Sequence, residues 1–180
     1  VRRWQAWVQE ATPAQVSDAA VLYAAALSAS RLKQHNQGLA LAQRLLAQPG
    51  LDEPARRAAS LLVLEIWLSP GADGAPSAAQ ASPASTPGRA WLNGLPALAA
   101  QALAGADRAS VLLGAQAAIR QGQPAQASQR LQVWVAEHAA DALAWQTLAQ
   151  AWSTQGQPLR AIRAEAESRV AQLDVDGAVD

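Results

Sequence analysis

The 180-residue sequence contains no cysteine, and several other residue types are scarce. Without cysteine there is no disulfide framework and no cysteine-based metal site, and either a reducing or an oxidising compartment stays open. Aromatic residues make up only 4% of the chain, so little favours strands. The hydrophobic fraction of 51% consists mostly of Ala, Leu and Val, and Ala and Leu are strong helix formers. The composition therefore predicts an all-α fold.

An excess of one charge sign is also lacking. The net charge is zero, Lys33 is the only lysine, and the thirteen arginines are scattered along the chain. A protein that binds nucleic acid or a membrane surface is expected to cluster its positive charge. No apolar run reaches the about 20 residues that span a bilayer. We therefore expect no nucleic-acid partner and no transmembrane segment.

Two stretches of the sequence match each other at a constant offset. Residues 114–127 and 148–161 share eight of fourteen positions, including the run Gln-Gly-Gln-Pro in the middle of each stretch. The resulting 34-residue period, with its helix-turn-helix pattern, is the value for tetratricopeptide repeats. The repeat therefore predicts an imperfect helical solenoid built from antiparallel helix pairs.

The second copy resembles the tetratricopeptide signature closely. Large, large, small and large side chains follow at i, i+3, i+4 and i+7, on one helical face: Trp145, Leu148, Ala149 and Trp152. Gly156 can end this helix and Pro158 can open the next, where Ala161 takes the small position. The preceding copy is weaker but keeps the turn, and Leu131 and Trp134 close its second helix.

An earlier unit of the same kind is predicted over residues 21–47. Thr12 and Pro13 are expected to open its first helix, residues 35–37 to form the turn, and Gly38 to take the small position. A short helix over residues 2–10 precedes this unit. Asp52 is expected to cap a further helix over residues 53–68.

A Pro-, Gly-, Ser- and Ala-rich stretch over residues 69–88 interrupts the helical pattern. Such a composition cannot bury a core, so we predict a disordered insertion. Helix resumes near residues 89–104, and a last amphipathic helix covers residues 158–173. The predicted organisation is residues 1–68, the insertion 69–88, and repeats over 89–180. The chain stops inside what looks like another helix, so we read it as a fragment.

Candidates for catalysis or metal binding are few. His35 and His138 lie far apart in the sequence, whereas metal sites usually use nearby histidines, so we interpret both as solvated turn residues. No Gly-rich phosphate loop, Gly-x-Ser-x-Gly motif or cysteine nucleophile occurs. We therefore predict no catalytic residue, cofactor-binding residue or metal ligand in this segment.

The tryptophans and the charged pairs of the last helix have simpler explanations than a ligand site. Trp67, Trp145 and Trp152 have core spacing, whereas Trp4, Trp7 and Trp91 could be exposed for stacking. Pairs four residues apart, such as Glu165 with Arg169 and Arg163 with Glu167, are typical of a solvated helix face.

The expected binding surface is the concave face, which the first helix of each repeat lines. One repeat contributes Leu112, Gln116, Ile119 and Arg120, and the next contributes Gln146, Gln150, Ser153 and Thr154. This surface is mostly uncharged and largely lacks the Lys, Asn and Arg with which some tetratricopeptide domains clamp a C-terminal carboxylate. We predict a protein or peptide segment as the partner, held by hydrogen bonds and apolar contact.

Residues 110–180 resemble the C-terminal repeat region of BepA-type periplasmic zinc metalloproteases, the β-barrel assembly-enhancing proteases. The runs that carry the resemblance are residues 141–149 and 156–167, with Leu173, Asp174, Ala178 and Val179 similar to a turn into a final helix. Residues 22–27 resemble the Leu-Tyr-Gly-x-Ala-Leu opening of an upstream repeat, although Ala24 replaces the Gly. Residues 51–108 match nothing in that family.

The resemblance implies a larger protein with a zinc peptidase domain and its His-Glu-x-x-His helix upstream. It implies a periplasmic location and outer-membrane proteins or the barrel-assembly machinery as partners. None of the family's zinc ligands falls on these residues. Two alternatives stay open: a cytoplasmic stand-alone adaptor that scaffolds a complex, and an assembly role in which exposed apolar positions pair two copies.

Overall fold

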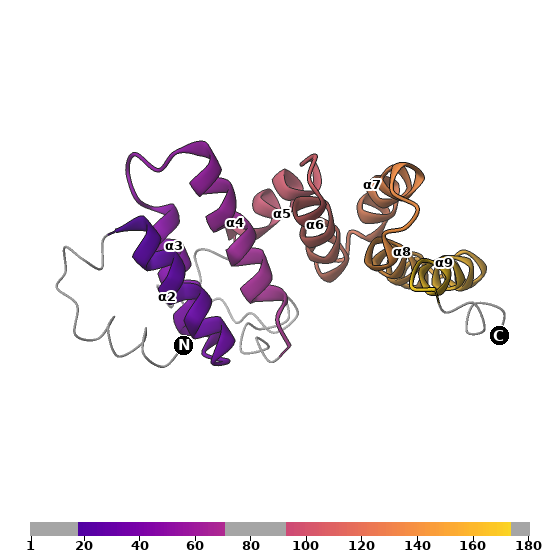
Figure 1. The fold of residues 1–180 in the computed structure, drawn as a ribbon, viewed down its shortest axis with the longest axis horizontal. Helices are drawn as coiled ribbons and strands as arrows, with labels where there is room; N and C mark the ends of the chain where they lie inside the picture. Colours follow the sequence, from indigo (N-terminus) through magenta and orange to yellow (C-terminus); the bar gives the residue numbers. More distant parts are fainter. Residues whose placement is uncertain (1–17, 71–92, 174–180) are drawn as a thin grey trace. The chain divides into compact units, whose positions relative to one another are not determined.

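The computed structural model describes residues 18–70 and 93–173, which form eight α-helices and no strand (Figure 1). The predicted all-α class is confirmed for these residues. The helices belong to two compact units, residues 1–94 and residues 95–180, and each unit is described by itself. No helix in the described ranges combines the length and apolar character needed to cross a membrane.

In the described part of the first unit, three consecutive helices pack one on the next. They are α2 (Ala19–Arg31), α3 (His35–Leu46) and α4 (Glu53–Leu68). Asp18 is the N-cap of α2, and its carboxylate accepts a hydrogen bond from the Ala20 N–H at 2.8 Å. The prediction that Thr12 and Pro13 open this helix is therefore wrong, and both residues lie outside the described ranges, as does the helix expected over residues 2–10.

The turn between α2 and α3 covers residues 32–34, three residues earlier than predicted. Lys33 has a left-handed backbone with φ of 62°, and the Gln34 N–H donates to the Ala29 carbonyl at 2.9 Å. α3 then begins at His35, which is buried, so this histidine is not a solvated turn residue. A left-handed residue favours Gly, and the Lys at this position concealed the turn in the sequence.

The small residue predicted for the second helix does bring two helices together. A Cβ atom added to Gly38 would lie 3.1 Å from the Ala26 carbonyl oxygen, so α2 and α3 meet closely here. The next prediction is confirmed as well: Asp52 caps α4 by accepting from the Ala55 N–H at 2.9 Å.

Up to residue 173, the second unit consists of five helices, each of which packs on the next. They are α5 (Leu95–Leu103), α6 (Arg108–Arg120), α7 (Pro124–Glu137), α8 (Ala142–Thr154) and α9 (Pro158–Ala171). α6 also contacts α8, so the first helices of the two 34-residue copies are neighbours. The helix expected over residues 89–104 is described only from Leu95, because residues 89–92 lie outside the described ranges.

The repeated Gln-Gly-Gln-Pro run forms the same turn twice. Gly122 and Gly156 have φ of 77° and 71°, and each follows the C-cap of its helix. The Gln157 N–H donates to the Trp152 carbonyl at 2.9 Å and the Gly156 N–H to the Ser153 carbonyl at 3.0 Å, which is a Schellman motif. The following proline needs no N–H partner in the first turn of the next helix.

Packing against α5 explains why the first copy of the repeat is the weaker one. A Cβ atom added to Gly114 would lie 2.4 Å from the Leu103 backbone nitrogen. Leu148 occupies the equivalent position in α8 and is fully buried. The close approach of α5 to α6 therefore requires a residue without a side chain where the second copy uses a large one.

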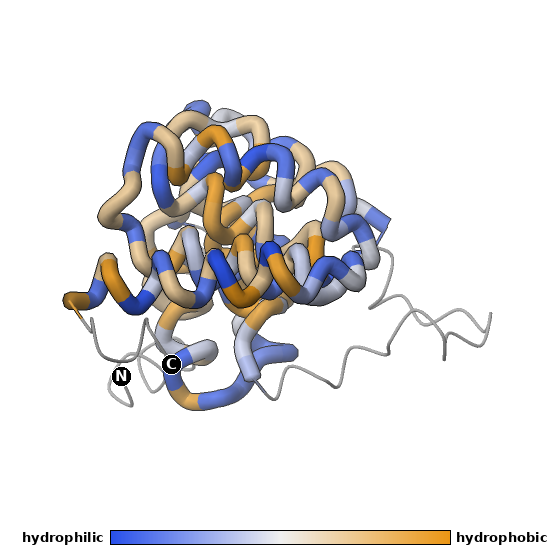
Figure 2. Tube along the Cα trace, turned by 90° about the vertical axis from the view of Figure 1, so that its right-hand side faces the viewer, coloured by the Kyte–Doolittle hydropathy of each residue, from blue (hydrophilic) through white to orange (hydrophobic). Residues whose placement is uncertain are grey.

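Most of the described tryptophans belong to the core. Trp67, Trp134 and Trp152 are buried, and Trp145 is half-buried with its indole N–H donating to the Ala139 carbonyl at 2.8 Å. Hydrophobic and hydrophilic segments alternate along the helices, as amphipathic packing requires (Figure 2). The remaining tryptophans and most of the predicted insertion over residues 69–88 lie outside the described ranges.

Candidate functional site

The exposed face of α8 carries a row of polar side chains. Gln146, Gln150 and Ser153 follow one another at helical spacing, opposite a buried face that includes Ala144, Leu148 and Trp152. Because the buried face anchors α8 in the core, this polar row has a fixed direction. α6 and α9 provide the neighbouring walls.

Together these helices form a groove of about 790 Å³. Its lining is dominated by amide and hydroxyl side chains, with one acidic and one basic residue: Gln116, Leu143, Gln146, Thr147, Ala149, Gln150, Ser153, Thr154, Glu165, Ser168, Arg169 and Gln172. The groove therefore offers hydrogen-bond donors and acceptors without a net charge.

The structure brings five of the eight predicted binding residues into this groove, namely Gln116, Gln146, Gln150, Ser153 and Thr154. Leu112 is only 5% exposed and belongs to the hydrophobic core, so its side chain is withdrawn from the surface. Ile119 is half-buried against the same core, and Arg120 is exposed at the end of α6 without lining the groove.

The α9 wall was missed by reasoning from the sequence. Glu165 and Arg169, predicted to be a solvated pair, line the groove together with Gln172. Their spacing at i, i+4 and i+7 places them on one helical face, which was the available signal. Which helix that face meets depends on tertiary packing and is not visible in the spacing.

The hydroxyl groups in the groove are already oriented by the backbone. Thr147, Thr154 and Ser168 each donate to a helix carbonyl at 2.8 Å, and the Ser168 bond joins α9 to Ala142 at the start of α8. Their oxygens can still accept hydrogen bonds. The side-chain amides of Gln146 and Gln150 make no hydrogen bond to any part of the chain that the structure describes, so they are available to a ligand.

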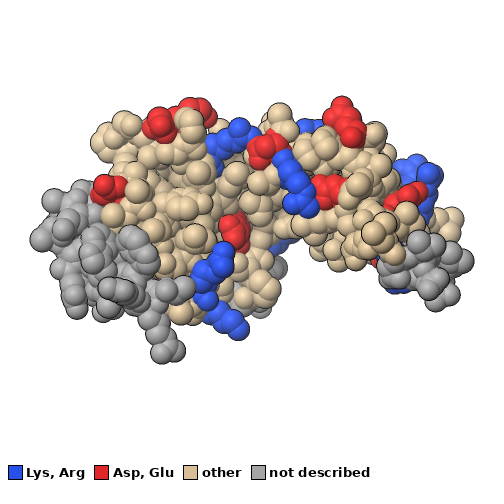
Figure 3. All heavy atoms as spheres, viewed as in Figure 1, with Lys and Arg blue, Asp and Glu red and all other residues tan. Residues whose placement is uncertain are grey.

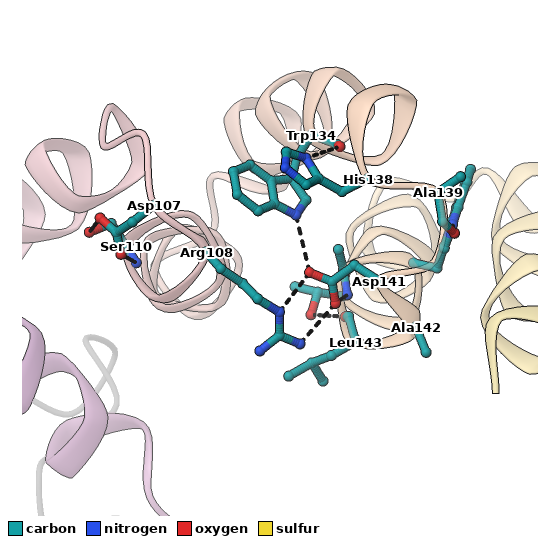
Figure 4. A network of polar contacts seen from close by, with 12 residues as sticks. Asp107, Arg108, Ser110, Trp134, His138, Ala139, Asp141, Ala142 and Leu143 are labelled. Atoms are coloured by element: carbon teal, nitrogen blue, oxygen red, sulfur yellow. Dashed lines mark hydrogen bonds and ion pairs between the residues drawn. The ribbon is translucent and has the colours of Figure 1, made fainter.

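A second depression of about 800 Å³ adjoins the groove and shares Leu143, Gln146 and Gln172 with it. Its wall is a polar network centred on Asp141 (Figure 4). Arg108 donates to both carboxylate oxygens of Asp141 at 2.8 Å, and the Trp134 indole N–H donates at 3.1 Å. The network therefore ties together α6, α7 and the N-terminus of α8.

The same contacts shift the pKa values of Asp141 and Arg108. The guanidinium of Arg108 lowers the pKa of Asp141 by hydrogen bonding, and further hydrogen bonds from Trp134 and from the Ala144 N–H act in the same direction. The carboxylate raises the pKa of Arg108 in return. Since both oxygens of Asp141 accept hydrogen bonds in its ionised form, the residue acts as a helix cap and an ion-pair partner rather than as a general base.

His138 lies beside this network at the end of α7. Its ring stacks on the Trp134 ring with centroids 3.9 Å apart and planes 11° from parallel, and its Nδ1 lies 3.1 Å from the Trp134 carbonyl oxygen. The residue is exposed, as predicted. Within residues 18–70 and 93–173, no three His, Asp or Glu side chains are grouped in a way that could hold a metal ion.

On the face shown in Figure 3, Lys and Arg alternate with Asp and Glu without a concentration of one sign. In comparisons with known proteins, no family model matches the chain and no curated protein matches it significantly.

Proposed function

We propose that this chain is a tetratricopeptide-type interaction module whose groove on α6, α8 and α9 binds an extended segment of another protein. The observation that carries the proposal is the pair of glutamine amides, without a partner among the described residues, in a neutral groove of about 790 Å³. Equivalent features that recur with the 34-residue period support the fold type, since Asp107 and Asp141 are N-caps and Gly122 and Gly156 end the helices that follow them.

The geometry of α8 suits an extended backbone. Gln146 and Gln150 are separated by four residues, which is a rise of about 6 Å along the helix. Alternate residues of an extended peptide are spaced by roughly 6.6 Å. Because each glutamine amide both donates and accepts, the two side chains can pair with the N–H and C=O groups of alternate peptide residues.

Because the lining of the groove carries no net charge, we expect it to recognise a peptide backbone and not an ionised group of the partner. Glu165 and Arg169 oppose each other in sign, and the other lining residues are neutral. A phosphopeptide or a free carboxylate would be expected to require a cluster of basic residues. The proposed partner is therefore an unfolded or extended protein segment of low net charge.

For the whole protein, we propose the role implied by the resemblance to BepA-type proteases. The module would hold unassembled outer-membrane proteins near a zinc peptidase domain in the periplasm. The competing proposal is a stand-alone cytoplasmic adaptor. The complete reading frame separates the two, because a signal peptide and a His-Glu-x-x-His motif upstream of Val1 support the first and a start codon adjacent to Val1 supports the second.

The groove can be tested with arrays of twelve-residue peptides that tile an outer-membrane β-barrel protein and, for comparison, a cytoplasmic protein. The double variant Gln146→Ala with Gln150→Ala removes two neutral hydrogen-bonding groups, each contributing about 1 kcal/mol. We expect its affinity for the best peptides to fall by roughly tenfold or more.

Gln126→Ala with Gln129→Ala is the matched control, because both glutamines are exposed on α7 and do not line the groove. Equal affinities of the two double variants, at equal helicity, would show that the groove is not the binding site. Preference for barrel peptides favours the envelope role, whereas equal binding to both sets favours a general adaptor.

A further inference from the structure

The outward face of α9 carries an apolar stripe that nothing in the described part of the chain covers. Its members are Leu159, Ile162 and Val170, which are 83%, 63% and 49% exposed, with half-buried Ala166 between them. Leu173, which is 87% exposed, follows the helix. Large exposed aliphatic side chains gathered on one helical face indicate an interaction surface.

Another helical repeat stacked on α9 would leave most of this stripe exposed. α7 shows which positions such stacking covers, because α6 and α8 both pack against it. The residues of α7 that lie 34 positions before Leu159, Ala166 and Val170 are Ala125, Gln132 and Ala136, and all three are exposed. Only Ser128, the equivalent of Ile162, is buried. The stripe therefore requires a different partner.

The spacing of the stripe is symmetric about Ala166. Ile162 and Val170 lie four residues to either side of it, and Leu159 and Leu173 lie seven residues to either side. An antiparallel pair of such helices related by a two-fold axis at Ala166 would place Ile162 against Val170 of the other copy. Leu173 lies beyond the C-cap of α9 with φ of 65°, so Leu159 would lie near the end of the other helix without a fixed partner. The small residue at the centre lets the two helices approach closely.

The charges that flank the stripe are complementary in the same arrangement. Arg163 and Glu167 lie on one flank of the stripe. Arg163 comes three residues before Ala166, where the axis passes, and Glu167 comes one residue after it. A two-fold axis perpendicular to the helix brings equal flanks together, so Arg163 would lie beside Glu167 of the second copy with an axial offset of about 3 Å. Glu165 and Arg169 have the same relation on the opposite flank.

From this symmetry we infer that α9 pairs with α9 of a second copy to form an antiparallel homodimer. One 14-residue helix per copy offers only a small interface, of the kind that transient complexes use, so we expect a weak dimer. The pairing is inferred from α9 alone, and Glu165 and Arg169 belong both to its flank and to the wall of the groove.

The oligomeric state of the 180-residue chain tests the inference. Sedimentation equilibrium from 1 to 500 μM should show the wild type changing from the 18.8 kDa monomer to the dimer. Val170→Glu should raise the Kd at least tenfold, whereas Ala136→Glu, at the equivalent exposed position of α7, should leave it unchanged. A wild type that stays monomeric at 500 μM, or equal effects of the two variants, overturns the inference.

Disulfide trapping tests the antiparallel register, because the chain has no cysteine of its own. Under mild oxidation, Ala166→Cys should give a covalent dimer, since the residue meets its own copy at the axis. Leu159→Cys should not, because position 159 lies seven residues from the axis and therefore roughly 21 Å along the helix from its own copy. Crosslinking of Leu159→Cys as efficient as that of Ala166→Cys rules out the antiparallel arrangement, and circular dichroism checks that each variant is folded.

Discussion

At the scale of single residues, Asp141 combines more roles than any other described carboxylate in the second unit. It caps α8, pairs with Arg108 of α6 and accepts from Trp134 of α7. This role of Asp141 is not evident from the residues around it in the sequence. The available signal was the 34-residue period that relates it to Asp107, which caps α6 in the same way and accepts from the Ser110 N–H at 3.0 Å.

The ion pair predicts a pH-dependent contribution to stability. The pKa of Asp141 is lowered in the folded state relative to the unfolded value of about 3.9. Its contribution is therefore complete above about pH 5 and is lost as the pH falls through the lowered folded pKa. Asp141→Asn keeps the shape and a capping oxygen but removes the charge, so it should be less stable than the wild type at pH 7, with a gap that narrows below about pH 4.

Thermal denaturation of both proteins from pH 7 to pH 2.5 measures this gap. Other acidic residues titrate equally in the two proteins and cancel in the comparison. A difference in Tm that stays constant over the whole range would show that the charge of Asp141 contributes nothing to folding.

The close contact at Gly114 leads to a second prediction about stability. Gly114→Ala places a Cβ atom 2.4 Å from the Leu103 backbone nitrogen, so α5 must move away from α6. The expected loss is about 1–3 kcal/mol of the free energy of unfolding, despite the better helix propensity of Ala. Gly94→Ala is the control, because its Cβ meets nothing within 4 Å. Urea denaturation in which the two variants lose equal stability would contradict the close approach.

At the scale of helices and turns, three hairpins share one connection. Lys33, Gly122 and Gly156 all have a positive φ and follow the C-cap of the preceding helix. In each case a small residue follows five positions later, as Gly38, Ala127 or Ala161. Lys33 therefore occupies the left-handed position at which the other two turns have glycine.

Replacing Lys33 by Gly should therefore stabilise the first unit. A residue with a side chain in the left-handed region costs about 1–2 kcal/mol, partly offset by the greater entropy of Gly in the unfolded chain. We expect a gain of about 0.5–1 kcal/mol. Gly122→Ala should lose about 1 kcal/mol by the converse argument. Chemical denaturation measures both, and destabilisation by Lys33→Gly would mean that the lysine side chain contributes contacts that outweigh the strain.

The same elements show what could be predicted from the sequence. The repeat located the turns at Gly122 and Gly156, and Asp52 located the start of α4, because caps and glycines have local causes. Local signals did not predict which side chains are buried where that depends on the packing of other helices. Leu112 and Gln146 are equivalent by the 34-residue register, yet Leu112 belongs to a core that includes Leu103 of α5, whereas Gln146 lines the groove.

At the scale of the whole molecule, the groove and the core beneath it belong to one unit. α6, α8 and α9 supply nearly every lining residue, and the core cluster is drawn from α5 to α9. A fragment of residues 93–180 should therefore fold cooperatively, since a compact unit with its own core can fold alone. It should also bind the peptides selected by the 180-residue chain with a Kd within about threefold, a factor worth about 0.65 kcal/mol.

Circular dichroism and fluorescence anisotropy measure these two properties of the fragment. A fragment that is helical but does not bind would place part of the site in residues 1–92. An unfolded fragment would show that the second unit needs the first for its stability.

The two Gln-Gly-Gln-Pro turns, which share φ values and hydrogen bonds, also make parts of the chain interchangeable. Excising residues 124–157 would join Gln123 to Pro158 and restore the same four-residue turn, now between α6 and α9. A gene duplication or deletion of 34 codons could therefore lengthen or shorten this protein without creating an unfamiliar junction. Duplication or deletion at this turn would change the number of helical hairpins, and each remaining hairpin would keep its glycine and proline.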